Sequence, residues 1–437
     1  MSVGATTMLN AFKKLWNDDR GNILVIAGAA LPLLVGAAGL ANDTIEWALW
    51  KRQLQRAADS AAVAGVYDRI HSGNTTGTAT VVAHDLTLNH HTGIALQATY
   101  PQVGYPADTS TKKQQVSVVL AVRKSLSFSA MFMAQAPLIR ASATAASIPG
   151  SDSYCLVSLE PTTLTGIEGS GNGTIDFTCG MITNSVSTNA ALAKGSSIVK
   201  ATVIAAAGGI AQSNNWQVGK YDPFVPAQAD PYASLTPVAS DFTGCAASPP
   251  ALTGSSGAGT TANPGCYSSI SVGSNKKLTL NPGTYIISGG GINVQGTLIG
   301  TNVSIILSNK NLATNAAIGS FDMNASGTLS LTAPTSGKWA GLAIYQDRRA
   351  VDSGGSLASA PNKINGGSTG SVVGALYFPN QGMVYNGGGT SSYICTQFVV
   401  KRILFSGNNT TSNKFKDDCP GTGLNKIQGG RKVRLVA

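Results

Sequence analysis

An apolar run at residues 23–41 constrains what this chain can fold into more than any other feature. The run carries no charge and consists almost entirely of Ala, Leu, Ile, Val and Gly, with one proline at Pro32. As a helix it is long enough to cross the ~30 Å hydrocarbon core of a bilayer. The sequence therefore predicts a membrane-spanning helix at residues 22–41, preceded by a basic leader at residues 1–21.

The residues on either side of the run predict its orientation in the membrane, and the length of the run bears on whether it is cleaved. Lys13, Lys14 and Arg20 precede it, whereas Asp43 and Glu46 follow it. This distribution of charge places the N-terminus in the cytoplasm and the bulk of the chain outside. A cleaved signal peptide is the alternative interpretation. The run exceeds the roughly 7 to 15 apolar residues of a signal peptide, and no good small-x-small cleavage site stands near its end, which favours a retained anchor.

Helical spacing continues beyond the run. Apolar and small residues recur mostly three or four positions apart from residue 45 to residue 65, with charged residues between them, so one continuous helix should leave the membrane. The small residues of this helix form a stripe that suits close packing, either against the chain's own sheet or against other subunits. The stripe consists of Ala57, Ala58, Ala61, Ala62 and Gly65.

The segment DRGNILVIAGAALPLLVGAAGLANDTIEWALWKRQLQRAADSAAVAGVYD, at residues 19–68, resembles the N-terminal segment of the TadG-like proteins of bacterial Flp (Tad) pilus systems. In both, a basic leader, an apolar helix containing Leu-Pro, an acidic residue and a QLQ-A-AD-AA helix follow in that order. The segment is also similar to type IV pilin-like subunits, whose leader is cut after a Gly when Glu stands at the fifth mature position. Here Gly21 would be that Gly and Ile26 holds the fifth place, so we expect the anchor to be retained.

Residues 42–149 are expected to form a small α+β unit, as in pilin-like subunits. Helices are predicted at residues 79–91 and 126–133, and alternating patterns predict strands at residues 94–100, 115–124 and 138–147.

From residue 150 the chain changes to short β-branched runs separated by Gly, Asn and Ser. The 437-residue chain has 51 glycines and only 11% charged residues, a composition common in exported β-rich proteins. The runs recur in uneven steps of roughly twenty residues, which favours a right-handed parallel β-helix over a β-sandwich for residues 150–437.

A second resemblance supports the β-helix. LNPGTYIISGGGINVQGTLIG and neighbouring segments resemble the C-terminal region found behind TadG-like N-termini in many proteobacterial proteins, which is taken to be a parallel β-helix. Many TadG-like proteins carry a von Willebrand factor A domain instead. The metal-binding Asp-x-Ser-x-Ser motif of that domain is absent here, so the resemblance implies no metal site.

Six cysteines all lie beyond residue 150, on the side placed outside, where thiols are oxidised. Proximity in sequence favours three disulfides, although other pairings remain open: Cys155 with Cys179, Cys245 with Cys266, and Cys395 with Cys419. No two cysteines stand two to four residues apart, so their spacing does not fit a zinc site. The segment from Cys395 to Cys419 is the candidate cap for an end of the solenoid.

The histidines predict no catalytic or metal site. His71, His84, His90 and His91 all lie in the small unit, and the adjacent pair would point apart on a helix. The β-rich region has no histidine, which removes a serine or cysteine triad there.

A polysaccharide lyase or hydrolase, which uses paired carboxylates or basic residues on one face, is the sharpest enzymatic alternative, and the one dense polar patch, at residues 345–349, is its candidate site, with Asp322 and Asp352 near it in sequence. An ion pair between Asp347 and Arg348 or Arg349 is the preferred interpretation, because fold-level analogy is weak evidence for catalysis. The net charge of +10 is scattered and accompanies no recognition module, so nucleic acid is not an expected partner.

These observations predict a non-enzymatic, single-pass membrane protein without a cofactor, and the resemblance implies that the membrane is the bacterial inner membrane. The resemblance implies that it belongs to a Tad/Flp pilus assembly or secretion apparatus, with other pilus or pseudopilin subunits as partners. The β-helix would project into the periplasm as a spacer or as a binding surface. A surface adhesin or a protein that binds envelope glycan is the alternative, and a polysaccharide-degrading enzyme is a weaker one.

Overall fold

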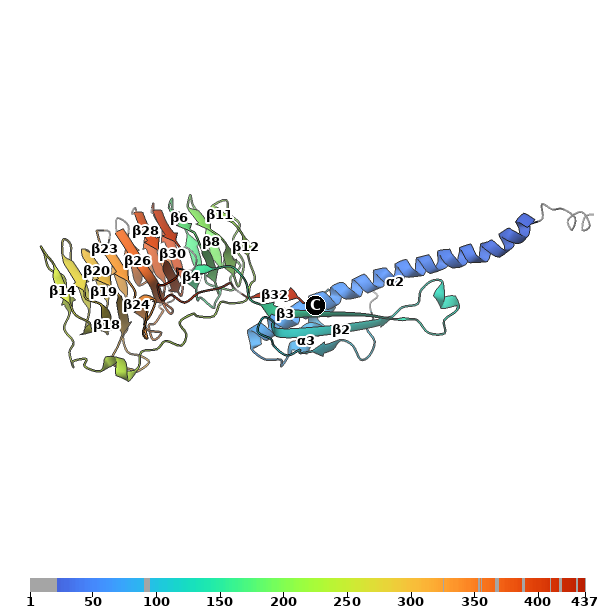
Figure 1. Ribbon diagram of the computed structural model, residues 1–437, viewed down its shortest axis with the longest axis horizontal. Coiled ribbons are helices and arrows are strands. Elements are labelled where there is room, and N and C mark those ends of the chain that lie inside the picture. The colour runs from blue at the N-terminus through green and yellow to red at the C-terminus, as the bar shows by residue number, and fades with distance from the viewer. Residues whose placement is uncertain are drawn as a thin grey trace, which may run out of the picture. The chain divides into compact units, whose positions relative to one another are not determined.

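The computed structural model describes residues 22–89, 95–324, 326–352, 354, 356–365, 369–386, 390–408, 410–415, 419–429 and 431–436. The chain forms two compact units (Figure 1). The first comprises Met1–Ser147 and Val433–Ala437, and the second comprises Ile148–Lys432. The last five residues, assigned above to the β-rich domain, therefore belong to the first unit.

The first unit is a four-stranded sheet packed against two helices. The helices are α2 (Asn22–Ser72) and α3 (Thr78–Leu88). The strands, in their order across the sheet, are β1 (Gln102–Gly104), β2 (Lys113–Arg123), β3 (Leu138–Ile148) and β32 (Lys432–Leu435). Val116, Val118 and Leu120 alternate along β2 and are buried, so this face forms the core beneath the helices.

Two elements of this unit differ from the sequence-based expectation. The strand expected at residues 94–100 is wrong, because the described residues 95–100 contain none. Strand β1 begins at Gln102 instead, after Pro101, which has no N–H to donate to a ladder. The helix expected at residues 126–133 is only the short 3₁₀ helix η2 (Ser129–Met131).

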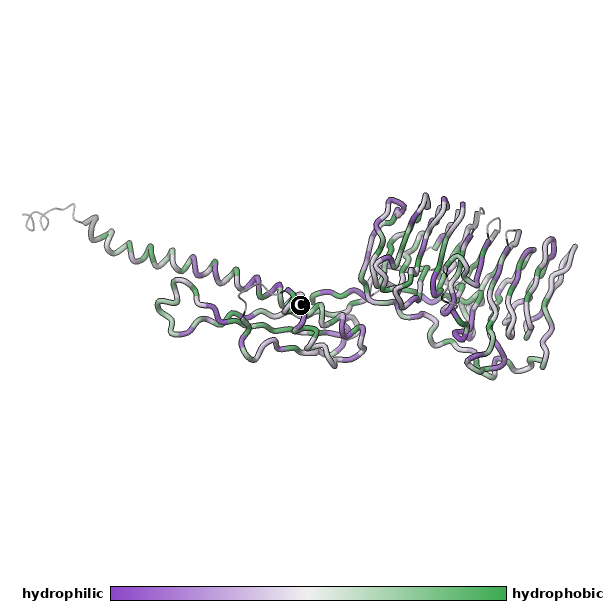
Figure 2. The backbone as a smooth tube through the Cα atoms, turned by 180° about the vertical axis from the view of Figure 1, so that it is seen from behind, coloured by the Kyte–Doolittle hydropathy of each residue, from purple (hydrophilic) through white to green (hydrophobic). Residues whose placement is uncertain are grey.

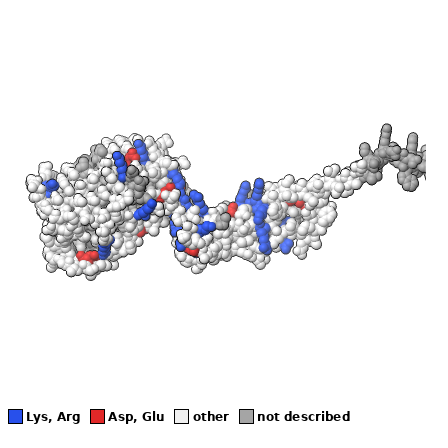
Figure 3. Space-filling model, viewed as in Figure 1, with Lys and Arg blue, Asp and Glu red and all other residues white. Residues whose placement is uncertain are grey.

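Helix α2 is continuous, as predicted, and its two halves have different surroundings. Leu31, Leu33 and Leu34 are 62%, 75% and 69% exposed, whereas Leu54 and Val66 are buried. Within the described residues, Ile26–Ser72 contains the one stretch that is long and apolar enough to cross a membrane. Hydrophobic residues dominate its N-terminal part (Figure 2), and the face in view carries no charged side chain there (Figure 3).

The second unit is a large all-β region of parallel sheets. One sheet contains, in order, β13 (Leu252–Thr253), β16 (Ile270–Val272), β19 (Ile292–Val294), β22 (Phe321–Met323), β25 (Asn362–Asn365), β27 (Met383–Asn386), β30 (Ile403–Ser406), β5 (Ile167–Gly169) and β8 (Ala191–Ala193). A shorter one contains β11 (Trp216–Val218), β9 (Ile198–Ala201), β6 (Thr174–Phe177), β31 (Thr410–Lys414) and β28 (Thr390–Ile394).

The longest sheet contains β12 (Tyr221–Asp222), β10 (Ile204–Ala206), β7 (Gly180–Thr183), β4 (Tyr154–Ser158), β29 (Thr396–Val400), β26 (Thr369–Phe378), β23 (Thr328–Thr332), β20 (Thr297–Thr301), β17 (Lys277–Leu280) and β14 (Thr260–Ala262). A branch joins it at β26 and contains β24 (Leu342–Gln346), β21 (Val303–Ser308), β18 (Gly283–Ser288) and β15 (Gly265–Tyr267). Two short 3₁₀ helices, η3 (Ala239–Phe242) and η4 (Leu357–Ser359), lie in the connections.

The interior of this unit is built from side chains that lie in register on neighbouring strands. Leu278 of β17 lies beside Leu298 of β20, which lies beside Leu329 of β23. All three are at most 1% exposed. Because parallel pairing brings like positions together, each inward-facing position of a strand extends one continuous apolar column.

The strand order shows that two halves of the unit meet within the stack. Strand β4 pairs with β7 on one side and with β29 on the other, while β5 pairs with β30 and β6 pairs with β31. We call these three pairings between early and late strands the seam. The early strands (residues 154–222) lie on one side of the seam, and the late strands (residues 252–414) lie on the other.

Candidate functional site

The end of the apolar run is tied to the connection between β2 and β3 by two carboxylates. Asp43 accepts hydrogen bonds from the backbone N–H groups of Phe128 (2.8 Å) and Ser129 (2.5 Å) and from the Ser129 hydroxyl. Glu46 accepts from the backbone N–H (3.2 Å) and the hydroxyl (2.6 Å) of Ser127. We call this arrangement the carboxylate clasp.

The clasp favours the ionised form of both acids. Burial opposes ionisation of Asp43 most strongly, but the hydrogen bonds from Ser129 and Phe128 outweigh it and hold the pKa of Asp43 below its usual range. The hydrogen bonds from Ser127 lower the pKa of Glu46. In the sequence, both acids indicate the orientation of the helix, an acidic residue after the apolar helix is part of the family resemblance, and neither acid is predicted to bind the connection between β2 and β3. The sequence does not predict the partners of these acids at residues 127–129. Several of these partners are backbone N–H groups, which no pattern of side chains indicates.

The small-residue stripe of α2 packs inside the first unit. Ala58, Ala61 and Ala62 are fully buried, and Ala57 is 9% exposed. A Cβ at Gly65 would lie 2.9 Å from Val116 Cγ1 of β2 and 3.1 Å from Val82 Cγ2 of α3. The stripe therefore meets the chain's own sheet and second helix, so it is not available to other subunits.

The polar patch at residues 345–349 fastens a long connection onto the sheet. Residues 223–250, which we call the strap, lead from β12 at one end of the longest sheet to β13. Arg348 donates to Asp230 (2.8 Å), to the carbonyl of Tyr232 (2.6 Å) and to the carbonyl of Leu235 (2.6 Å). The Tyr377 hydroxyl also donates to Asp230, at 2.8 Å.

Two of the three carboxylates in this region, Asp347 and Asp352, are engaged in ion pairs, whereas no ion pair is found for Asp322 within the described residues. Asp347, 2% exposed, pairs with Arg349 at 2.8 Å, and Asp352 pairs with Arg402 at 2.9 Å. Burial raises the pKa of Asp347, but hydrogen bonds from Arg349 and Ser308 hold it below the usual range. The preferred interpretation, a structural ion pair, agrees with this geometry.

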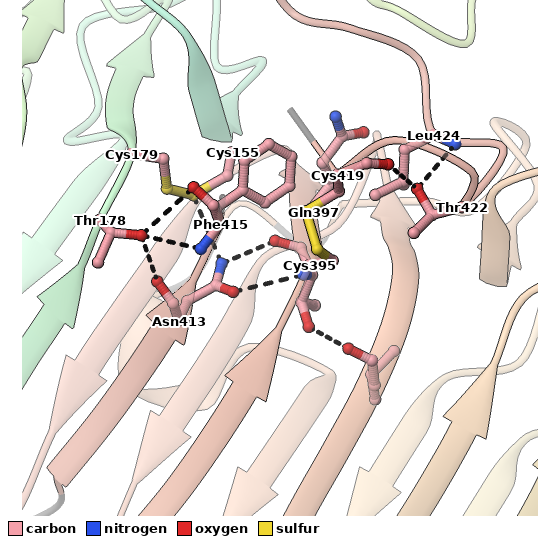
Figure 4. The surroundings of a disulfide bond; sticks show 12 residues. Cys155, Thr178, Cys179, Cys395, Gln397, Asn413, Phe415, Cys419, Thr422 and Leu424 are labelled. Carbon is pink, nitrogen blue, oxygen red and sulfur yellow. Dashed lines mark hydrogen bonds between the residues drawn. A yellow bond between two sulfur atoms is a disulfide. The ribbon is translucent and has the colours of Figure 1, made fainter. Parts of the chain in front are cut away.

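Three disulfides cross-link the second unit, and they join the same pairs that sequence proximity favours: Cys155–Cys179, Cys245–Cys266 and Cys395–Cys419. Asn413, fully buried, lies between the first and third disulfides (Figure 4). Its amide donates to the carbonyl of Thr396 at 2.7 Å and lies 3.4 Å from Cys155 Sγ.

The role of end cap proposed for the Cys395–Cys419 segment is wrong. Cys395 stands between β28 and β29, and β29 pairs with strands on both of its sides. The disulfide therefore lies at the seam and not at an end of the stack.

The structure describes two of the four histidines. His71 and His84 are exposed on α2 and α3, and His90 and His91 lie outside the described residues, as does the basic leader. In the part of the chain that the structure describes, no group of three or more His, Cys, Asp or Glu residues is placed to hold a metal ion.

The fold defines a class of protein in which one candidate membrane-spanning helix continues into a small α+β unit and a large parallel-β unit follows. Residues 21–68 match the model of the family described as putative Flp pilus-assembly TadE/G-like, so the chain carries a TadE/G-like Flp pilus-assembly domain. The match covers the apolar half of α2, the clasp acids and the small-residue stripe, and no von Willebrand factor A domain is identified in the C-terminal region. No curated protein and no solved structure matches the chain.

Proposed function

We propose that the chain is a single-pass, inner-membrane component of a bacterial Tad/Flp pilus assembly or secretion apparatus. The observation that carries this proposal is the family match on residues 21–68, which coincides with the helix whose first half is exposed and apolar. An exposed surface of this kind is costly in water and favourable in lipid.

The orientation follows from charge and from cysteine chemistry. Lys13, Lys14 and Arg20 precede the helix, which favours a cytoplasmic N-terminus. The three disulfides lie on the other side of the helix in the sequence and are favoured in an oxidising compartment. Together they support a periplasmic location for both units.

The parallel sheets support a β-helix as the architecture of the second unit. Successive strands such as β16, β17 and β18 go to different sheets, and each pairs with a strand about one coil later in the sequence. Nine strands stacked at ~4.8 Å give a rod of roughly 40 Å. Such a rod would serve as a spacer, or as a surface that contacts other pilus subunits or envelope glycan.

A non-enzymatic role is supported by how the polar patch is used. Asp347 and Asp352 are held by arginines, and Arg348 binds the strap, so none of the three is poised as an acid or a nucleophile. We expect Asp347→Asn to leave any glycan-cleaving activity of the purified chain unchanged.

The proposal is tested by replacing residues 150–431 with a short Gly/Ser linker in the host bacterium. This variant keeps Val433, which packs against the core of the first unit, so the anchor and the small unit are preserved. We expect normal membrane insertion and loss of pilus assembly. Normal piliation would overturn the proposal.

Location is tested in parallel with a C-terminal tag and added protease. A tag that is cleaved only after the outer membrane is opened supports the periplasmic role. A tag that is cleaved on whole cells would favour the surface adhesin instead.

A further inference from the structure

The connection between β2 and β3 presents an uncharged, apolar tip to solvent. From residue 125 to residue 139 the chain contains no Asp, Glu, Lys or Arg. Met131, Phe132 and Met133 are 76%, 74% and 49% exposed. We call residues 125–136 the tip loop. A cluster of exposed large apolar side chains on a soluble surface marks a contact with another apolar phase.

The carboxylate clasp holds the tip loop at a fixed level along α2. Phe128 lies so close to Gly39 that a Cβ at Gly39 would overlap its ring. The centre of the Phe132 ring lies 5.2 Å from the centre of the Phe128 ring, in an edge-to-face arrangement. The exposed Phe132 is therefore placed beside the turn of α2 that contains Gly39.

The turn of α2 beside the tip loop is the outer end of the apolar run. Gly39 lies within residues 23–41, and Asp43 is one helical turn, about 6 Å, further along. The polar interface on each side of a bilayer is only roughly 5 to 8 Å thick. If α2 spans the bilayer with this run, the tip loop lies where acyl chains meet headgroups.

Aromatic and basic side chains follow the tip loop at the next level of the unit. Lys124 Nζ lies 4.1 Å from the centre of the Trp50 ring, and Lys51 donates to the carbonyl of Arg140. Arg123 donates to the carbonyl of Ala136 at 2.9 Å. Lys and Arg side chains gather on the first unit (Figure 3). An apolar tip followed by Trp and cations matches the layering of a membrane interface, with phosphates beside the cations.

We propose that the tip loop is a second membrane contact, which inserts into the outer-leaflet interface beside α2 and fixes the first unit against the bilayer. The occupant of the apolar surface is lipid, because the surface is continuous with the exposed apolar half of α2. This inference rests on the proposed membrane anchor. It adds a surface that the family match at residues 21–68 does not include.

The test uses the full chain reconstituted in vesicles of phosphatidylethanolamine and phosphatidylglycerol. Ala130→Cys places a polarity-sensitive fluorophore in the tip loop, next to Met131. The matched control is Ser110→Cys, on the exposed connection between β1 and β2 at the other end of β2. Both labelled positions lie on the same side of the membrane-spanning run of α2. The ratio of quenching at the two positions therefore does not depend on which way the chain inserts into the vesicles.

We expect the emission of the probe at residue 130 to shift to shorter wavelength. Its quenching by brominated lipid should be several-fold stronger than at residue 110, and its quenching by aqueous iodide several-fold weaker. Phe132→Glu in the Ala130→Cys chain should remove most of this difference. Because Phe132 is exposed, this change is not expected to unfold the sheet.

Equal quenching at residues 130 and 110 would overturn the proposal. A probe at residue 130 that is shielded from both iodide and brominated lipid would also overturn it, because protein would then cover the tip. Flotation of the chain with the vesicles reports on the α2 anchor separately. Failure of the anchor is thereby distinguished from failure of the tip loop.

Discussion

Replacing Arg348 with Met should open the strap without unfolding the sheets. Arg348 joins Asp230 and the carbonyls of Tyr232 and Leu235, which are all in the strap. Met retains much of the aliphatic volume but has no charge and no donor. The substitution therefore removes all three hydrogen bonds and leaves the Asp230 carboxylate with the Tyr377 hydroxyl and the backbone N–H of Tyr232.

The expected effect is about 3 kcal/mol on the opening of the strap. A hydrogen bond to a charged group contributes roughly 1.5 to 3 kcal/mol. The Arg348 and Asp230 side chains are 28% and 18% exposed, so water recovers part of the loss. A value of ~3 kcal/mol corresponds to a rise of roughly a hundredfold in the opening constant.

Hydrogen exchange of the detergent-solubilised chain, read by mass spectrometry, measures this opening. Amides of residues 223–250 should exchange roughly a hundredfold faster in Arg348→Met, while the columns of the sheets stay protected. Arg349→Met is the matched control, because Arg349 donates to the carbonyls of Asn311 and Ala313 and pairs with Asp347, and none of these groups lies in the strap. It should raise exchange near residues 309–317 and leave the strap unchanged. Equal exchange of the strap in both variants would refute the role assigned to Arg348.

Three further outcomes follow from the same contacts. The pKa of Asp347 is lower in the folded chain than the ~3.9 of an unfolded Asp. The stabilisation of the fold by ionised Asp347 is therefore complete above pH ~3.9 and is lost as pH falls through the folded pKa. The urea midpoints of wild type and Asp347→Asn should differ at pH 6 and converge well below pH 4. Ala61→Leu should destabilise the first unit by ~1–3 kcal/mol through overpacking, measured as a lower melting temperature, whereas Ala64→Leu, at a partly exposed position, should have little effect. Replacing Cys245 and Cys266 with Ser should cost about 3 kcal/mol and speed proteolysis within the strap; unchanged cleavage would contradict the role of this disulfide.

Local patterns predicted the elements whose formation depends on neighbours in the sequence. The helical spacing through Leu54 and Gly65 and the alternation along β2 and β3 each reflect one buried face, and both are present in the structure. The failure at residues 94–100 is also local, because these residues alternate but lie just before Pro101.

Long-range order was beyond the same patterns. Nothing in the spacing of β4 shows that its neighbour is β29, about 240 residues away, because every strand of a parallel stack has a similar apolar texture. Strand β32 is short and half-exposed, and long-range contacts place it in the first unit: its pairing with β3 and the packing of Val433 against the core. The clasp depends on backbone N–H groups, which have no sequence signature.

The strap has a second consequence, because it touches both halves of the unit. Asn184, just after β7, donates to the carbonyl of Gln228 at 2.8 Å, on the early side of the seam. On the late side, the Tyr232 hydroxyl donates to Gln397 Oε1 of β29 at 2.8 Å. The segment that links the two halves covalently thus also joins them across the seam.

A force along the stack would have to break the β4–β29 ladder and the strap together, since the two act side by side. This arrangement is consistent with the spacer role proposed above, and it makes Arg348→Met a test of the seam as well as of the strap. Because the β4–β29 ladder does not involve Arg348, these two strands should stay protected when the strap opens, and a rise of exchange in β4 and β29 would show that the strap also stabilises the seam.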